Sequence, residues 1–121
     1  DNDFHIKDFG AHKNDSKDDY PDFIMPAAEY ISNNVAIGII FGGSGLGEAM
    51  AANRFKGIRA AVFYGGPEEI VKLSRLHNNA NILSIAARFV SFEETIEVVN
   101  LWLSVDFEEG RHLKRINKLD S

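Results

Sequence analysis

Four glycines and a glutamate stand close together in the stretch FGGSGLGEAMAANR, residues 41–54. Glycines allow backbone conformations with positive φ and let a ligand approach the main chain closely. Successive backbone N–H groups at the start of a helix form a nest for an anion. Glu48, directly after the last glycine, adds a carboxylate that can act as a general base. The stretch therefore combines groups that could remove a proton from carbon and stabilise the resulting oxyanion.

Two common nucleotide-binding motifs do not fit this stretch. A dinucleotide fingerprint requires G-x-G-x-x-G after a first strand, with an acid about 20 residues further on. A P-loop requires Lys and then Ser or Thr after its last glycine, whereas this chain has Glu48 and Ala49. A carboxylate beside a pyrophosphate would also be repelled. The alternative to catalysis is that Glu48 stabilises the helix dipole, which contributes about 0.3–1 kcal/mol.

Strand and helix patterns alternate along the chain. Such alternation predicts βαβ units, a parallel sheet and a functional site at the carboxyl ends of the strands. The continuous apolar run at 35–41 predicts a strand buried on both faces. Ser91, with Glu94 three residues later, predicts a helix-capping box. The predicted strands are 5–9, 35–41, 58–64 and 81–86, the predicted helices are 20–34, 46–54, 67–77 and 91–103, and 11–19 is a predicted loop.

Length and composition restrict the class of protein. A chain of 121 residues is expected to form one domain. Its net charge of −5 argues against a broad nucleic-acid surface, which needs an excess of basic residues. No apolar run approaches the roughly 20 residues of a membrane helix. There is no signal-peptide pattern, so a cytoplasmic location is expected.

Metal ligands are not prominent in the sequence. The chain has no cysteine, and its histidines at 5, 12, 77 and 112 form no close pair along the sequence. The H-E-x-x-H pattern is absent, and the acids at 15, 18 and 19 lack the spacing of a calcium-binding loop. No metal site is therefore expected.

Several segments together resemble the ribose-5-phosphate isomerase type B family, which also includes galactose-6-phosphate isomerase subunits. The resemblance covers nearly all 121 residues and preserves the order of the segments. It implies a Rossmann-like three-layer α/β/α sandwich with a parallel sheet, and an aldose–ketose isomerase that needs no cofactor. The segments are DFG at 8–10, DYPD at 19–22, GGSGLGEAMAANRFKGIRAAV at 42–62, SRLHNNAN at 74–81 and EEGRHLKR at 108–115.

The resemblance implies a particular catalytic base. In the commoner branch of the family, the base is a cysteine two residues before the Thr or Ser of the glycine loop, where this chain has Gly42. A second branch carries GGSG-x-GE and uses the glutamate instead, which corresponds to Glu48. Ser44 then corresponds to the loop hydroxyl that helps to move protons between oxygens. The amides that would hold the enediolate belong to the stretch Gly43–Gly47, including Gly43, Gly45 and Gly47.

Further positions match residues that bind the sugar phosphate in the family. His77 corresponds to the histidine that opens the furanose ring, although a lone histidine at a helix end more often packs or caps. Arg111 and Arg115 are four residues apart, so they would share one helix face, and guanidinium groups suit phosphate. The resemblance implies a homodimer, or a tetramer of such dimers, with active sites completed by the second subunit. The implied substrate-binding residues are Tyr20, Asn78, Arg88, Arg111 and Arg115.

Two departures from the family pattern bear on the expected function. Family members open with a strand that ends in Asp-His-Ala-Gly, which this sequence lacks. Residues 1–121 are therefore expected to form a single sugar-phosphate isomerase domain without its first strand and helix, roughly 20–25 residues. Gly65-Gly66-Pro67 also replaces an acid and a tyrosine after the strand at 58–64, which would alter the pocket wall.

The expected reaction is the interconversion of ribose 5-phosphate and ribulose 5-phosphate through an enediolate. The altered pocket wall leaves open an isomerase of a hexose 6-phosphate, such as allose or galactose 6-phosphate. A non-catalytic module that binds phosphosugars is the alternative from another class.

Overall fold

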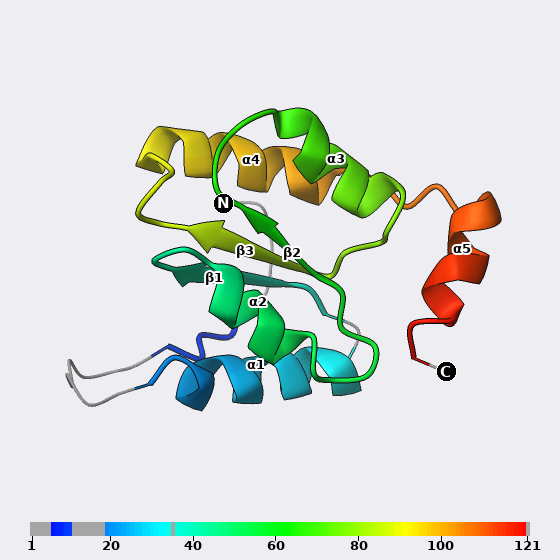
Figure 1. Cartoon of the computed structure of the whole chain (residues 1–121), viewed down its shortest axis with the longest axis horizontal. Helices are drawn as coiled ribbons and strands as arrows, with labels where there is room; N and C mark the ends of the chain where they lie inside the picture. Colours follow the sequence, from blue (N-terminus) through cyan, green and yellow to red (C-terminus); the bar gives the residue numbers. More distant parts are fainter. Residues whose placement is uncertain (1–5, 11–18, 35, 121) are drawn as a thin grey trace.

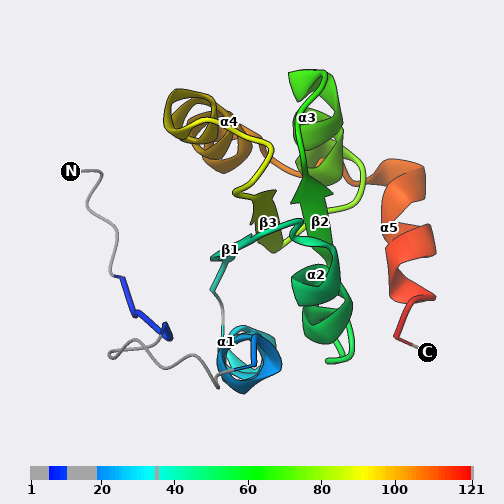
Figure 2. The same ribbon diagram turned by 60° about the vertical axis from the view of Figure 1, so that its left-hand side comes forward.

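The computed structural model describes residues 6–10, 19–34 and 36–120. In this part of the chain, three parallel strands form one sheet in the order β1-β3-β2. Helices α1 and α2 cover one face of the sheet and α3 and α4 cover the other, as Figures 1 and 2 show from two directions. The elements are α1 (Pro21–Asn33), β1 (Gly38–Gly42), α2 (Leu46–Ala52), β2 (Ala60–Phe63), α3 (Glu68–Leu76), β3 (Ile82–Ala86), α4 (Phe92–Ser104) and α5 (Gly110–Asn117).

The central strand β3 divides the apolar core between the two faces. All five of its residues are buried. Leu83 and Ile85 pack with α3 and α4, around Trp102, whereas Ile82 packs on the other face with α1 and α2. Because successive side chains of a strand point to opposite faces, one strand contributes to both clusters. The predicted three-layer α/β/α sandwich with a parallel sheet is confirmed.

The structure confirms most of the predicted elements and corrects two of them. The predicted capping interaction is present, because the backbone N–H of Glu94 donates to Ser91 Oγ at 3.1 Å. However, the strand predicted at 35–41 is not buried on both faces: Phe41 in β1 is 60% exposed, and Ile37, just before β1, is 43% exposed. Among the described residues, β1 has a strand neighbour on one side, so it is an edge strand.

The predicted strand at 5–9 is the second correction. Residues 6–9 take part in no strand, and residue 5 lies outside the described residues. Most of the predicted loop at 11–19 also lies outside them. In addition, no helix within the described residues is long and apolar enough to span a bilayer.

The strands share one direction, so the two ends of the sheet differ. Gly42 at the end of β1 aligns with Ala86 at the end of β3, and both lead into loops at the carboxyl end of the sheet. Helix α3 runs back to the amino end, where α5 also lies, at the right of Figure 1. These two ends carry the two groups of predicted site residues.

Candidate active site

Hydrogen bonds hold the glycine loop against the end of β3. The carbonyl of Gly42 accepts from the N–H of Ala87 at 2.7 Å, and that of Gly43 accepts from Arg88 at 3.1 Å. The buried Ser84 hydroxyl donates to the Gly45 carbonyl at 2.8 Å. The loop is therefore fixed at the carboxyl end of two adjacent strands, as predicted.

Local geometry explains two residues inside the loop. Gly45 has φ +76°, a left-handed conformation that favours glycine, and it caps the start of α2. Ser44 Oγ accepts a hydrogen bond from the N–H of Leu46 at 3.2 Å. Since the oxygen is the acceptor in this bond, the Ser44 O–H can still donate to a ligand.

Glu48 and Gly42 fit together as a pair. The Glu48 carboxylate lies in the space that a side chain at position 42 would occupy. A Cβ placed on Gly42 would overlap the carboxylate, with even the more distant oxygen, Oε1, at 2.7 Å. Real Cβ atoms essentially never come this close to another heavy atom, so the absence of a side chain at 42 makes room for the acid.

Tyr20 and Arg88 reach the same loop from other elements. A Cβ on Gly47 would lie 2.6 Å from the Tyr20 hydroxyl, and a Cβ on Gly43 would lie 3.1 Å from Arg88 Nε. Tyr20 stands at the start of α1, and Arg88 follows β3. The fold thus brings these two predicted substrate-binding residues to the loop that carries Ser44 and Glu48.

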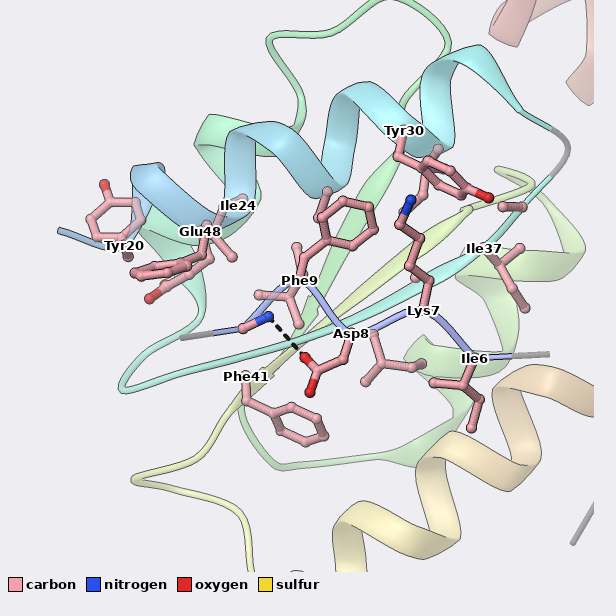
Figure 3. A pocket seen from close by; sticks show the side chains of 18 of the residues that line it. Ile6, Lys7, Asp8, Phe9, Tyr20, Ile24, Tyr30, Ile37, Phe41 and Glu48 are labelled. Carbon is pink, nitrogen blue, oxygen red and sulfur yellow. Dashed lines mark hydrogen bonds between the residues drawn. The ribbon is translucent and has the colours of Figure 1, made fainter. Parts of the chain in front are cut away.

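A groove of about 940 Å³ begins beside this group and continues along β1. Figure 3 shows Tyr20 and Glu48 next to each other at one end of it. The remainder is mostly apolar and is lined by α1, β1 and residues 6–10, including Ile24, Ile37 and Phe41. The polar end is the part that suits a sugar.

The other predicted site residues lie at the opposite end of the sheet. His77 follows the last residue of α3, and the exposed Asn78 is its neighbour. Arg111 and Arg115 lie on α5 and are also exposed. Glu48 and His77 are separated by at least the length of β3, roughly 13 Å for four steps along a strand. The described chain does not bring these two residues together.

Two histidines meet at this second group. The segment just before α5 is joined to the end of α3 by a hydrogen bond from the Glu108 N–H to the Leu76 carbonyl, at 2.8 Å. The His77 and His112 rings stack with their centroids 4.2 Å apart and their planes 14° apart. The spacing of the histidines along the sequence gave no sign of this pair, because helix packing brings together residues that are far apart in sequence.

The surroundings of His112 favour its neutral form. Burial lowers the pKa of His112, and the neighbouring His77 and Arg111 lower it further. Glu108 opposes this shift, with its Oε1 3.6 Å from His112 Nε2. The sequence patterns did not associate Glu108 with His77. Glu108 lies in the segment before α5 rather than on a helical turn with His112, so its four-residue spacing from His112 gave no reliable signal.

Comparison with known proteins finds close relatives over most of the chain. The family model described as Ribose/Galactose Isomerase matches residues 1–119. A probable ribose-5-phosphate isomerase B of Mycoplasma genitalium is 41% identical over 118 residues, covering 96% of this chain and 76% of the relative. A putative sugar phosphate isomerase of Bacillus subtilis is 36% identical over 113 residues, covering 93% of this chain and 74% of the relative.

Solved structures agree with these matches. The crystal structure of ribose-5-phosphate isomerase B from Mycoplasma genitalium, with bound ribulose 5-phosphate, superposes with a TM-score of 0.89 at 41% identity. The match covers 96% of this chain and 76% of that one. Ribose-5-phosphate isomerase B from Clostridium thermocellum has a TM-score of 0.89 at 39% identity, covering 97% and 78% of the two chains.

Proposed function

This chain belongs to the ribose/galactose isomerase family, and we infer that it interconverts ribose 5-phosphate and ribulose 5-phosphate. Relatives at 36–41% identity are named for this reaction, and one of their structures contains bound ribulose 5-phosphate. The observation in this chain that carries the proposal is the fit of the Glu48 carboxylate over Gly42. The fit places a carboxylate that can act as a base next to position 42, where the commoner branch of the family has its cysteine.

Glu48 moves the proton in the proposed reaction. Its carboxylate takes the proton from C2 of the open-chain aldose. The electrons of that C–H bond form a C1–C2 double bond, and the π electrons of the C1 carbonyl move onto O1, which gives the enediolate. Returning the proton to C1 gives the ketose. The Ser44 hydroxyl helps to move a proton between the two substrate oxygens, and backbone amides of the stretch Gly43–Gly47 stabilise the negative charge. A positioned general base typically accelerates such a reaction by about 10²–10⁴-fold.

Ring opening and phosphate binding require the second group of residues. We propose that His77 opens the furanose ring, that Asn78 and Tyr20 contact the sugar, and that arginines hold the phosphate. Since His77 lies at the opposite end of the sheet from Glu48, one chain cannot supply both to one substrate. A homodimer, alone or within a tetramer, would place His77, Asn78, Arg111 and Arg115 of one subunit against Glu48, Tyr20, Ser44 and Arg88 of the other.

One observation favours a larger sugar as a second candidate. Gly65 and Gly66 follow β2 with φ values of +108° and +92°. A Cβ on Gly66 would contact nothing within 4 Å, and one on Gly65 would meet only the Phe89 carbonyl, at 4.0 Å. This open space lies beside Phe89, the neighbour of the predicted substrate-binding residue Arg88. The absence of larger side chains at these two positions is the ground on which we keep a hexose 6-phosphate as the second candidate.

Steady-state assays of the purified natural chain test the choice of substrate. We expect kcat/KM for ribose 5-phosphate to exceed that for allose 6-phosphate or galactose 6-phosphate by at least about tenfold, since a one-carbon difference is worth about 10–200-fold. A higher value for a hexose phosphate would select the second candidate. Saturable binding of all three sugars without turnover would instead indicate a binding module.

We also propose that the groove beside β1 holds a further strand of the natural chain. The exposed Phe41 and Ile37 line it, and an unpaired strand edge is a liability that proteins usually cover. The matched residues make up 76% of the Mycoplasma genitalium relative. Hydrogen exchange would test this, because the amides of β1 should exchange more slowly in the natural chain than in residues 1–121 alone.

A further inference from the structure

His77, Glu108 and His112 each present a metal-ligating atom, and these atoms lie within 4.8 Å of one another. We propose that the three side chains bind Zn²⁺ or a similar late first-row divalent cation. Two imidazole nitrogens and a carboxylate oxygen are a donor set that such ions accept. Mg²⁺ and Ca²⁺ prefer oxygen ligands and are not expected to compete.

The three ligands come from two packed elements. His77 is the residue that caps the end of α3, His112 lies in the first turn of α5, and Glu108 lies in the segment just before α5. The Glu108 N–H to Leu76 carbonyl bond ties these elements together directly beside the ligands. The site is therefore formed by tertiary packing, which keeps the entropy cost of bringing the ligands together small.

Burial differs among the ligands in a way that suits an open site. The side chain of His112 is 9% exposed and is held in place, whereas that of Glu108 is 63% exposed. An ion here would have three protein ligands on one side and water on the other. Structural zinc sites usually have four protein ligands, so three ligands with an open fourth position would leave this ion in contact with water.

Binding requires a small rearrangement. The lone pair of an imidazole nitrogen lies in the ring plane, and the stacked planes of His77 and His112 are only 14° apart. One ring must therefore turn before both nitrogens can point at one ion. His77 is the ring with more room, because His112 is buried. With metal–ligand distances of about 2.0–2.2 Å, the ligand atoms must also approach to roughly 3.5 Å.

Charge limits the affinity. Arg111 and Arg115 lie on the same helix as His112, close enough to influence it, and both repel a cation. A single carboxylate, Glu108, opposes them. The ion is therefore expected to bind reversibly and not to be needed for folding.

Bound metal would inhibit the isomerase. It would occupy a ring nitrogen of His77 and turn that ring out of its stack, so His77 could no longer assist ring opening. This consequence rests on the proposed function, whereas the binding site itself does not.

Co²⁺ titration of the untagged full chain tests the site without substrate. Co²⁺ held by two imidazoles and a carboxylate is expected to show stronger visible absorption than aqueous Co²⁺, and Zn²⁺ should displace it at a stoichiometry of one per chain. Glu108→Gln should weaken binding by about 100-fold or more, since the loss of even an outer partner of a metal ligand costs 10–100-fold. Glu109→Gln changes the exposed neighbouring residue and is the matched control. Its affinity for Co²⁺ should stay within about threefold of that of the unchanged chain.

Three further results decide the proposal. His77→Gln should weaken Co²⁺ binding as strongly as Glu108→Gln, whereas replacing both His5 and His12 by Ala should leave it unchanged. Unsaturable absorption, or equal affinity for Glu108→Gln and Glu109→Gln, would overturn the site and leave the stacked histidines as a packing contact. If Co²⁺ binds as described but Zn²⁺ does not inhibit isomerisation, the site stands and its proposed link to ring opening is wrong.

Discussion

At the scale of single residues, the position of Glu48 depends on a residue that has no side chain. The carboxylate fills the space next to Gly42, so a side chain at position 42 would force the carboxylate to move. From the sequence, the resemblance alone indicated that Glu48 replaces a cysteine at position 42. The overlap gives a physical reason why a side chain at 42 would displace the carboxylate from its present position.

Gly42→Ala tests this pairing. The added methyl group would displace the Glu48 carboxylate, so we expect kcat to fall at least about tenfold, towards the 10²–10⁴ loss expected when a general base is removed. If the methyl group acts by displacing the Glu48 carboxylate, it has nothing to displace once that carboxylate is removed. Adding Gly42→Ala to the Glu48→Gln variant should therefore lower kcat little further. Independent, additive losses in the double variant would show that the methyl group acts elsewhere.

The buried Ser84 in β3 holds the glycine loop through a hydrogen bond, so its replacement should lower stability. Ser84→Ala removes the buried hydrogen bond to the Gly45 carbonyl, which also accepts from the Ala49 N–H. We expect the free energy of unfolding to fall by about 0.5–1.5 kcal/mol, measured by urea denaturation. Ser104→Ala is the control, because it removes an exposed hydrogen bond to the Leu101 carbonyl. It should change the free energy of unfolding by less than about 0.5 kcal/mol.

At the scale of elements, local sequence patterns predicted most of the helices and strands. They missed the features that depend on how these elements pack against one another. Periodicity and capping residues located α1 and α4, because both signals are contained within the segment itself. The burial of β1 was predicted wrongly, since an apolar run does not reveal whether a strand has a partner on each side. The stacking of His77 on His112 could not be predicted either, because it depends on how α5 packs.

Ser91→Ala tests the cap of α4. It removes the acceptor for the Glu94 N–H, so we expect a loss of about 1 kcal/mol in unfolding free energy. Ser91→Asp keeps an acceptor and should remain close to the wild type. Equal losses in both variants would mean that the hydroxyl matters for something other than capping.

At the scale of the whole molecule, the two groups of predicted site residues lie at opposite ends of one sheet. The resemblance predicted the members of both groups, but the sequence could not show their separation, which follows from strand direction and from the return path of α3. We therefore propose that an active site that includes Glu48 and Arg115 is assembled from two chains.

Mixing two damaged variants tests this assembly. Glu48→Gln and Arg115→Ala should each have low activity as pure proteins. If the sites are shared, each mixed dimer contains one intact site, so random re-association should restore about a quarter of wild-type activity. The assay is isomerisation of ribose 5-phosphate after co-refolding at equal concentrations. Activity no higher than the mean of the two parents would contradict shared sites.

The central claim is that Glu48 removes the C2 proton, and the most direct test is exchange of that proton with heavy water. Deuterium incorporation at C2 of ribose 5-phosphate would be followed by NMR for the natural chain and for Glu48→Gln. We expect exchange to fall by about 10²–10⁴ in the variant, with the fold retained. Equal exchange in both proteins would contradict the claim, because Glu48 would then be a helix cap and the base would lie elsewhere.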